Sequence, residues 1–289
     1  MVRIEGGLGV IGGSGLYHMD GLVVQDEVEV STPFGAPSDR YVVGELHGRT
    51  VAFLPRHGRS HTILPGELNF RANIYGFKKL GVERIVSVSA VGSMKDEIEP
   101  MHVVLPDQFI DRTRRRLDTF FGDGMVAHVG FSDPVCPELH AALKAASEAA
   151  GATVWPEGTY LCMEGPAFST RAESHLYRSW GVSVIGMTNL QEAKLAREAE
   201  ICYATVALVT DYDCWHESEE AVSADMVMAN LRHNAATAQR IVSEIAGMTL
   251  GDRTCPCAEA LKTALVTRPD CIAPATRERL DIIIGRYVE

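Results

Sequence analysis

The sequence is short of positive charge and of aromatic side chains, and it has no long apolar run. Lys and Arg number 27 against 38 Asp and Glu, a formal net charge of -11, and aromatic residues make up only 7% of the 289 residues. This balance repels polyanions, so we expect no nucleic-acid partner and no binding to an acidic membrane. No apolar run approaches the ~18 residues of a membrane span, and the first residues lack the basic and apolar regions of a signal peptide. We therefore expect a cytoplasmic protein.

The cysteines do not form the framework of a small secreted domain. Seven is an odd number, and their spacing is scattered, so reduced thiols are expected. Cys255-Pro256-Cys257 is the exception in spacing. It is compatible with a strained, reducible bridge, with a clasp to another thiol, or equally with two surface thiols.

No internal repeat, low-complexity tract or Gly/Ser linker divides the chain, and short β-branched runs alternate with amphipathic stretches. This alternation predicts the α/β class. The predicted strands are Leu8–Ile11, Leu22–Val30, Tyr41–Glu45, Thr50–Leu54, Ile85–Ala90, His102–Leu105, Thr159–Met163, Ser183–Ile185 and Cys202–Thr210. The predicted helices are Leu68–Leu80, Pro137–Ala150, Ser169–Trp180, Leu190–Glu198, Ser223–Ala246, Ala258–Val266 and Thr276–Tyr287.

The only interruption that resembles a boundary is Gly251–Pro256. The segment beyond this interruption is too short to fold alone. We predict one domain over residues 1–250, and a helical extension over residues 251–289 that packs on it.

Two glycine patterns open the chain. Gly7–Gly12 matches the G-x-G-x-x-G dinucleotide fingerprint, which would make the protein an oxidoreductase, but these glycines flank a strand-like run where the fingerprint should open a helix. Gly12-Gly13-Ser14-Gly15 is better formed, because consecutive glycines let N–H groups converge on an anion and Ser14 adds a hydroxyl. The alternative is a plain tight turn.

Two further anion-binding candidates come after predicted strands. Arg56 and His57 come directly after Thr50–Leu54, and a guanidinium can hold two phosphate oxygens while the imidazole adds a pH-dependent donor. Exposed solvated charge is the alternative. A metal held by His57 and His61 is disfavoured, because Gly58 weakens a helix there and no carboxylate is nearby in sequence. Ser87–Ser93 ends another strand with small hydroxyl residues and a glycine, a weak signal alone.

Asp211 and Asp213 lie at the mouth of the apolar run Cys202–Thr210. Such a pair can bind a metal, cap a helix or read a heterocycle. The single basic run, Arg112–Arg116, is interpreted as a solvated loop without function.

Together these segments resemble the 5′-methylthioadenosine phosphorylase branch of the trimeric purine nucleoside phosphorylase family, from about Gly9 to Gly247. The matching stretches are Gly12–Leu16, Thr32–Gly35, Pro37–Asp39, Arg56–Arg59, Ser89–Ser93, Asp107–Thr113, Glu164–Pro166, Arg171–Ser174, Met187-Thr188 and Thr210–Trp215.

The resemblance implies a single-domain mixed sheet with flanking helices, a homotrimer or dimer of trimers, and no metal or organic cofactor, with inorganic phosphate as co-substrate. It assigns phosphate binding to Ser14, Arg56, His57, Ser89, Ala90 and Thr188. It assigns nucleoside binding to Met187, Phe168, Asp211, Asp213 and His128, the last reaching across a subunit interface. We predict that Ser169, Ala224, Val227 and Met228 set specificity, because the last three are apolar residues of a predicted helix and favour a 5′ methylthio group over a hydroxyl.

Several positions depart from the family pattern. Ser14 and Ser89 stand where Thr is common, Ala167 replaces an Arg, Gly186 replaces an Asn, and Ala224 stands where the methylthio branch often has Val. The last change would enlarge the pocket for the 5′ group.

The implied reaction is phosphorolysis of 5′-methylthioadenosine, with Asp211 as the acid that protonates the leaving purine and His57 as a second catalytic residue. A carboxyl pair matches the N7 acceptor and N6 donor of a 6-aminopurine better than a 6-oxopurine. The alternatives are a purine nucleoside phosphorylase of broader or 6-oxopurine specificity, including methylthioinosine, the dinucleotide-binding oxidoreductase, and a non-catalytic nucleoside-binding protein.

Overall fold

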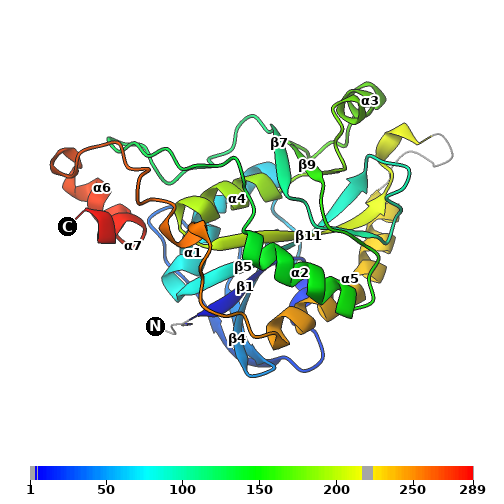
Figure 1. Cartoon of the computed structure of the whole chain (residues 1–289), viewed down its shortest axis with the longest axis horizontal. Coiled ribbons are helices and arrows are strands. Elements are labelled where there is room, and N and C mark those ends of the chain that lie inside the picture. The colour runs from blue at the N-terminus through cyan, green and yellow to red at the C-terminus, as the bar shows by residue number, and fades with distance from the viewer. Residues whose placement is uncertain (1–3, 5, 217–223, 289) are drawn as a thin grey trace.

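The computed structural model describes residues 4, 6–216 and 224–288, except for the side chains of residues 14, 17, 224–229 and 231–233. Figure 1 shows one twisted sheet with helices on both faces, so the predicted α/β class is confirmed. The strands are β1 Gly7–Gly12, β2 Val23–Val28, β3 Tyr41–Leu46, β4 Arg49–Pro55, β5 Val82–Ser93, β6 Val103–Val104, β7 Gln108–Arg112, β8 Val154–Trp155, β9 Thr159–Met163, β10 Val184–Gly186 and β11 Cys202–Asp211.

The sheet is mixed. Its main path runs β2-β3-β4-β1-β5-β10-β9-β7, and β11 adds to β5, followed by β6 and β8. The centre is parallel, because β1 pairs in parallel with β4 and β5, and β5 with β11. The carboxyl ends of these four strands therefore meet at one edge, the usual position of a ligand site in an α/β sheet.

Two helical layers enclose the sheet. Helices α1 and α4 pack on one face together with the C-terminal segment, and α2 and α5 pack on the other. Side chains such as Phe77 and Leu195 on one face, and Leu143 and Ile241 on the other, are fully buried. The helices are α1 Phe70–Leu80, α2 Pro137–Ala149, α3 Arg171–Ser179, α4 Asn189–Glu198, α5 Ala224–Gly247, α6 Pro274–Arg279 and α7 Asp281–Ile284.

The C-terminal segment is less helical than predicted. The helix expected over Ala258–Val266 is wrong: only the 3-10 turn Pro256–Glu259 forms. Cys257 is drawn into the core on one face of the sheet, whereas Leu261 enters the core on the other, and its N–H bonds the Glu200 carboxylate at 3.0 Å. These anchors compete with a continuous helix. The predicted helix Thr276–Tyr287 is broken at Leu280.

Strands β7 and β8 were missed by the sequence reasoning: β8 has only two residues, and three of the five residues of β7 are polar. Among the described residues, none of the helices combines the length and apolarity that a membrane crossing requires.

Candidate active site

The carboxyl edge of the sheet contains a fork. Strand β5 pairs with β1 as far as Ser87, opposite Ile11, and on that same side it pairs with β10 only from Gly92. On its other side β11 pairs with β5 in unbroken register as far as Val91, and then with Gly92 after a bulge between Val209 and Asp211. Between Ser87 and Gly92 the backbone of β5 therefore has no paired strand on that side among the described residues, because β1 and β10 diverge there. Such switch points are where open α/β sheets bind ligands.

Arg56 closes the floor of this fork. Its main-chain N–H bonds Gly12 O at 2.9 Å, which joins the ends of β4 and β1. Its Nη1 donates to Val88 O at 2.9 Å and its Nη2 to Ser87 Oγ at 2.6 Å. The guanidinium also donates to Glu192 of α4, from Nε to Oε1 at 2.6 Å and from Nη2 to Oε2 at 3.2 Å.

The sequence predicted that the Arg56 guanidinium holds two phosphate oxygens, and the structure differs from this. Nε and Nη2 of the guanidinium are bonded to the Glu192 carboxylate, so they do not hold two phosphate oxygens in this conformation. Only one N–H of Nη1 remains for a ligand. Burial opposes the charge of Arg56, but the Glu192 carboxylate outweighs it and raises the pKa of Arg56. Sequence reasoning missed Glu192, since a lone acid inside a helical pattern carries no signal for burial.

The same acid belongs to a wider polar network beneath the fork. Glu192 also accepts from Ser87 Oγ at 2.8 Å and from the Tyr203 hydroxyl at 2.9 Å. Asn189, the first residue of α4, donates to Ser87 at 2.9 Å and to Thr205 at 2.9 Å. A fully bonded buried network of this kind is rigid, because each member would be costly to leave unpaired.

Above this floor lie two buried hydroxyls. Ser89 is 8% exposed and Tyr160 is 0% exposed, and within the described part of the chain neither hydroxyl has a hydrogen-bond partner. Burial raises the pKa of Tyr160, whereas Ser89 and the Thr188 backbone act in the opposite direction. That places this hydroxyl beside both, although none of these contacts has hydrogen-bond geometry. Buried polar groups are normally paired, so these two hydroxyls are available to hydrogen-bond a ligand.

Tyr160 was not predicted as a site residue, and its position depends on Gly186. A Cβ at residue 186 would lie 1.9 Å from the Tyr160 hydroxyl. Gly186 therefore makes room for this side chain. The replacement of the family's Asn by Gly186 was the one signal in the sequence that pointed here.

The other predicted phosphate ligands are located as follows. Thr188 is 5% exposed and directly precedes α4, and Ala90 is part of the open stretch of β5. Ser14 begins a 3-10 turn, Ser14–Tyr17, at the end of β1, while its side chain lies outside the described residues.

His57 follows Arg56 and is held as a neutral ring. Its Nδ1 bonds Ile63 O at 2.8 Å, so Nδ1 carries the proton and Nε2 is an acceptor. Burial and the neighbouring Arg56 charge lower the pKa of His57 to about 4. The donor expected from the sequence, whose charge depends on pH, is therefore neutral at pH 7 and gives its N–H to Ile63 O. Instead, His57 can accept a hydrogen bond from a protonated phosphate oxygen.

The carboxylates of Asp211 and Asp213 are both 5% exposed at the end of β11. Asp211 accepts from Thr210 Oγ1 at 2.7 Å and from the N–H of Asp213 at 2.8 Å. Asp213 accepts from Ser174 Oγ of α3 at 2.6 Å. Burial raises the pKa of Asp213, partly offset by the Ser174 hydrogen bond.

Gly92 allows the pair to approach β5, since a Cβ there would lie 2.9 Å from Asp211 Oδ1. In the described ranges 6–216 and 224–288, neither acid caps an α-helix. Asp213 instead begins the 3-10 turn Asp213–Trp215, which has no side-chain cap.

The loops at the rim carry the predicted nucleoside contacts. Phe168 is 44% exposed, and Ser169 adjoins the acid pair through its carbonyl, which accepts from Cys214 Sγ at 3.3 Å. Met187 lies under the cis Gly165-Pro166 turn, where a Cβ at Gly165 would be 2.6 Å from its sulfur.

Arg116 corrects the interpretation of the basic run as a solvated loop. Its side chain is 1% exposed, and it donates to Met187 O, to Met163 O at 3.2 Å and to Glu164 O at 2.6 Å. It therefore holds the two rim loops together.

Three expected residues of α5 cannot be placed, because the side chains of Ala224, Val227 and Met228 lie outside the described residues. His128 lies on the long connection between β7 and α2, where its N–H donates to Ala264 O at 2.8 Å. That hydrogen bond ties His128 to the C-terminal segment and not to the fork.

The dinucleotide fingerprint lacks its structural context. Gly7–Gly12 forms strand β1 throughout, and Gly12 packs where a Cβ would lie 2.3 Å from Leu16 Cδ1. The glycines serve packing and do not form a turn into an α-helix.

Comparison with known proteins decides the family, because residues 8–246 match the model of the Phosphorylase superfamily. The chain belongs to this superfamily. Two phosphorylase relatives are named S-methyl-5'-thioadenosine phosphorylase. That of Koribacter versatilis (strain Ellin345) is 61% identical over 97% of this chain and 96% of the relative, and that of Geobacter sulfurreducens (strain ATCC 51573 / DSM 12127 / PCA) is 62% identical over 97% and 99%.

Solved phosphorylase structures share the fold. A methylthioadenosine phosphorylase from an antarctic soil metagenomic library superposes with a TM-score of 0.92 at 49% identity, over 97% of this chain and 99% of that one. A mutant adenosine/methylthioadenosine phosphorylase of Schistosoma mansoni, solved with methylthioadenosine, gives 0.83 at 33% identity over 89% and 96%. The predicted phosphorylase fold is confirmed.

Proposed function

We propose that this chain catalyses the phosphorolysis of S-methyl-5'-thioadenosine to adenine and 5-methylthioribose 1-phosphate. The observation that carries the proposal is the fork, which sets unpaired hydroxyls beside β5 and a buried carboxyl pair at the end of β11, within a chain more than 60% identical to proteins of that name. One part suits an anion and the other the edge of a heterocycle.

Phosphate is bound first by neutral donors. The hydroxyls of Ser14, Ser89 and Thr188, with the N–H of Ala90, surround it, and we add the hydroxyl of Tyr160. Arg56 contributes its positive charge and at most one N–H to the phosphate, because Nε and Nη2 of its guanidinium are bonded to Glu192. Hydrogen bonds to an anion are stronger than neutral ones, so these five donors favour an anion over a neutral ligand.

The reaction is a transfer at C1′ of the ribose. The bond between C1′ and N9 of the purine breaks with its electron pair moving to the base, and a phosphate oxygen forms the new bond to C1′. Holding phosphate against C1′ turns a weak nucleophile into an effective one. His57 accepts a hydrogen bond from a proton-bearing phosphate oxygen through Nε2, which orients the attacking oxygen.

Negative charge collecting on the purine is neutralised by a proton delivered to N7. We assign this general acid role to Asp211, which is worth roughly 100- to 10,000-fold in rate. Asp213 faces the neighbouring N6 amino group. Phe168 packs against the base, and Met187 against the ribose.

The second candidate is a purine nucleoside phosphorylase of broader or 6-oxopurine specificity, including methylthioinosine. Ala224 favours it, because a smaller residue than Val leaves room beyond a methylthio group. Ser169, Val227 and Met228 complete the specificity set that would decide between the two.

The assembly is inferred from the same family pattern. We propose a homotrimer, or a dimer of trimers, in which His128 of one protomer reaches the 5′ end of the nucleoside of its neighbour. The position of His128, on the connection between β7 and α2 and tied to the C-terminal segment, suits that role. We propose that the reaction takes place in the cytoplasm and needs no metal or organic cofactor.

Release of base from methylthioadenosine, adenosine and inosine, each with and without phosphate, tests the proposal. Phosphate-dependent adenine release that favours the methylthio substrate is expected. Preference for inosine would select the second candidate. Binding without release of any base would leave a non-catalytic nucleoside-binding protein, and phosphate-independent binding of NAD(H) would revive the oxidoreductase interpretation.

A further inference from the structure

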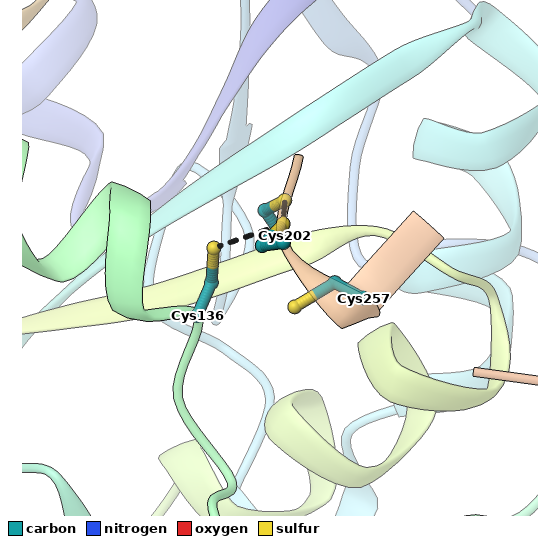
Figure 2. A group of neighbouring side chains, drawn as sticks. Cys136, Cys202 and Cys257 are labelled. Carbon is teal, nitrogen blue, oxygen red and sulfur yellow. Dashed lines mark hydrogen bonds between the residues drawn. The ribbon is translucent and has the colours of Figure 1, made fainter. Parts of the chain in front are cut away.

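Four cysteines from three distant segments converge inside the protein. The sulfurs of Cys136, Cys202, Cys255 and Cys257 all lie within 4.8 Å of one another, and all four residues are buried. Figure 2 shows Cys136 at the start of α2, Cys202 on β11 and Cys257 on the segment after α5, with their sulfurs gathered around one point. The alternative of surface thiols at Cys255 and Cys257 is therefore wrong: they are 8% and 1% exposed.

Each cysteine is positioned by a different element of secondary structure. Cys136 is the N-cap of α2, and its main-chain N–H bonds Tyr203 O at 2.9 Å, which ties α2 to β11. Cys202 is the first residue of β11. Cys255 caps the 3-10 turn Pro256–Glu259, which turns the chain so that Cys257 faces the same point.

We propose that these four cysteines bind one Zn²⁺ ion in a tetrahedral site of thiolate sulfurs. A zinc–sulfur bond is about 2.3 Å long, so the sulfurs of a tetrahedral site are separated by about 3.8 Å. The sulfur of Cys255 lies 3.6 Å from that of Cys136 and 3.4 Å from that of Cys202. Small side-chain rotations bring such a group to the required spacing without moving the backbone.

The surroundings suit a dry, structural site. The cysteines belong to the apolar core on the α2 and α5 face, among side chains such as Leu139, Leu143 and Ile245. The N–H of Leu139 points at Cys136 Sγ at 3.5 Å, and a helix N-terminus stabilises a thiolate. Tetrahedral sites of four sulfurs select zinc or iron, and closed sites of this kind stabilise the fold.

On binding, each of the four thiols forms a bond to the metal and loses its proton to solvent, with no change in oxidation state. The ion is remote from the reaction, because Cys202 and Asp211 stand at opposite ends of β11, about 30 Å apart at ~3.3 Å per residue. Its role is to fasten the segment after Gly251 to the body. The proposed phosphorolysis, which uses no metal, is unchanged.

Metal analysis of the full-length protein, purified with zinc in the growth medium and then freed of loose metal, tests the site. One zinc per chain is expected. Alkylation in denaturant with a chelator but no reductant should modify all seven cysteines of the chain. Two disulfides would leave only three reactive thiols, and that result, or a protein that neither holds nor takes up zinc, would overturn the proposal.

Variants locate the ligands. Cys257→Ser should lower the zinc content several-fold and lower the thermal midpoint, whereas Cys271→Ser, which changes an exposed cysteine outside the cluster, should alter neither. If Cys257→Ser does not fold, cobalt replaces the variant as the probe: wild-type protein reconstituted with Co²⁺ should show the intense charge-transfer absorption of four thiolate ligands. Absence of that band would contradict the site.

Discussion

Glu192 holds Arg56 through two parallel hydrogen bonds, at 2.6 Å from Nε and 3.2 Å from Nη2, and the two side chains are only 1% and 4% exposed. The pair spans the point where β1 and β10 separate along β5. It therefore anchors a fixed positive charge beneath the proposed anion site, and Nε and Nη2 of Arg56 are bonded to the protein's own carboxylate. Catalysis by electrostatics depends on charges that are already in place.

Replacing Glu192 with Gln should destabilise the protein by about 3–5 kcal/mol, the usual cost of leaving one partner of a buried ion pair uncompensated. Because the substitution changes the hydrogen bonds of the Arg56 guanidinium, it should also alter the KM for phosphate more than the KM for nucleoside. Denaturant unfolding and steady-state kinetics with varied phosphate measure the two effects.

The control is Glu259→Gln, which breaks an ion pair with Lys262 at 3.0 Å whose side chains are both 63% exposed. Surface pairs contribute about 0–1 kcal/mol, so this variant should match the wild type. If the two substitutions cost the same, the pair beneath the fork has no special role.

Tyr160→Phe should raise the KM for phosphate several-fold and leave the free energy of unfolding nearly unchanged. The reason is that, among the described residues of the free protein, the Tyr160 hydroxyl has no partner, so its removal breaks no hydrogen bond until phosphate binds. Initial rates against phosphate concentration, with unfolding curves, separate the effects.

Tyr41→Phe is the matched comparison. Tyr41 is equally buried, but its hydroxyl donates to Asn73 O, on α1, at 2.7 Å. This variant should lose about 1 kcal/mol of stability and keep its KM. A loss of stability without a change in KM for Tyr160→Phe as well would show that its hydroxyl is structural.

His57 should contribute to stability in the direction opposite to a salt-bridged histidine. Its folded pKa of about 4 lies below the ordinary 6.5, so the unfolded chain binds more protons between these values. Stability from this residue is therefore present above pH 6.5 and lost as the pH falls toward 4. His57→Gln should remove that slope, which unfolding at pH 5 and pH 7.5 tests. An unchanged slope would contradict the buried neutral ring.

Most strands of the sheet, and the loops for which we propose phosphate binding, were predictable because both are local. A β-branched run followed by Gly12-Gly13 or by Arg56-His57 indicates a strand and its ligand loop whatever the rest of the chain does. The acid pair Asp211 and Asp213 was predictable for the same reason.

Partners distant in sequence were not predictable. Glu192 lies 136 positions from Arg56, and Tyr160 owes its place to a glycine on the neighbouring strand. Arg116 looked like one of several solvated arginines, and only the closure of two loops around it shows otherwise. Pairings of this kind depend on topology, which residue type alone does not encode.

Glu198 should make stability fall as the pH rises. Burial raises its pKa to about 7, even though Phe120 N and Thr119 Oγ1 both donate to it at 2.7 Å. The folded state therefore binds the extra proton between about pH 4.5 and 7, and stability is lost across that window, by about 3 kcal/mol at 1.36 kcal/mol per unit. Glu198→Gln should flatten the difference in unfolding free energy between pH 5 and 8. Glu148→Gln, on the exposed end of α2, should not.

Changing Asp211 or Asp213 at the end of β11 to Asn should alter the kinetics in two different ways. Asp211→Asn removes the proton donor to N7, so kcat/KM for methylthioadenosine should fall roughly 100- to 10,000-fold. Asp213→Asn leaves an acceptor for Ser174 but turns a donor toward the base, so activity should shift from 6-aminopurine toward 6-oxopurine nucleosides. Kinetics with paired adenosine and inosine substrates measure both.

The pH dependence separates the two roles further. Burial raises the pKa of Asp213, so its protonated fraction declines as the pH rises, and the preference between amino and oxo substrates should drift with pH in the wild type but not in Asp213→Asn. Asp96→Asn, a 69% exposed carboxylate paired with Arg178, should behave as the wild type. Full kcat/KM in Asp211→Asn would remove Asp211 from the mechanism and leave Asp213 as the acid, because it is the carboxyl whose burial favours the protonated form that a proton donor needs.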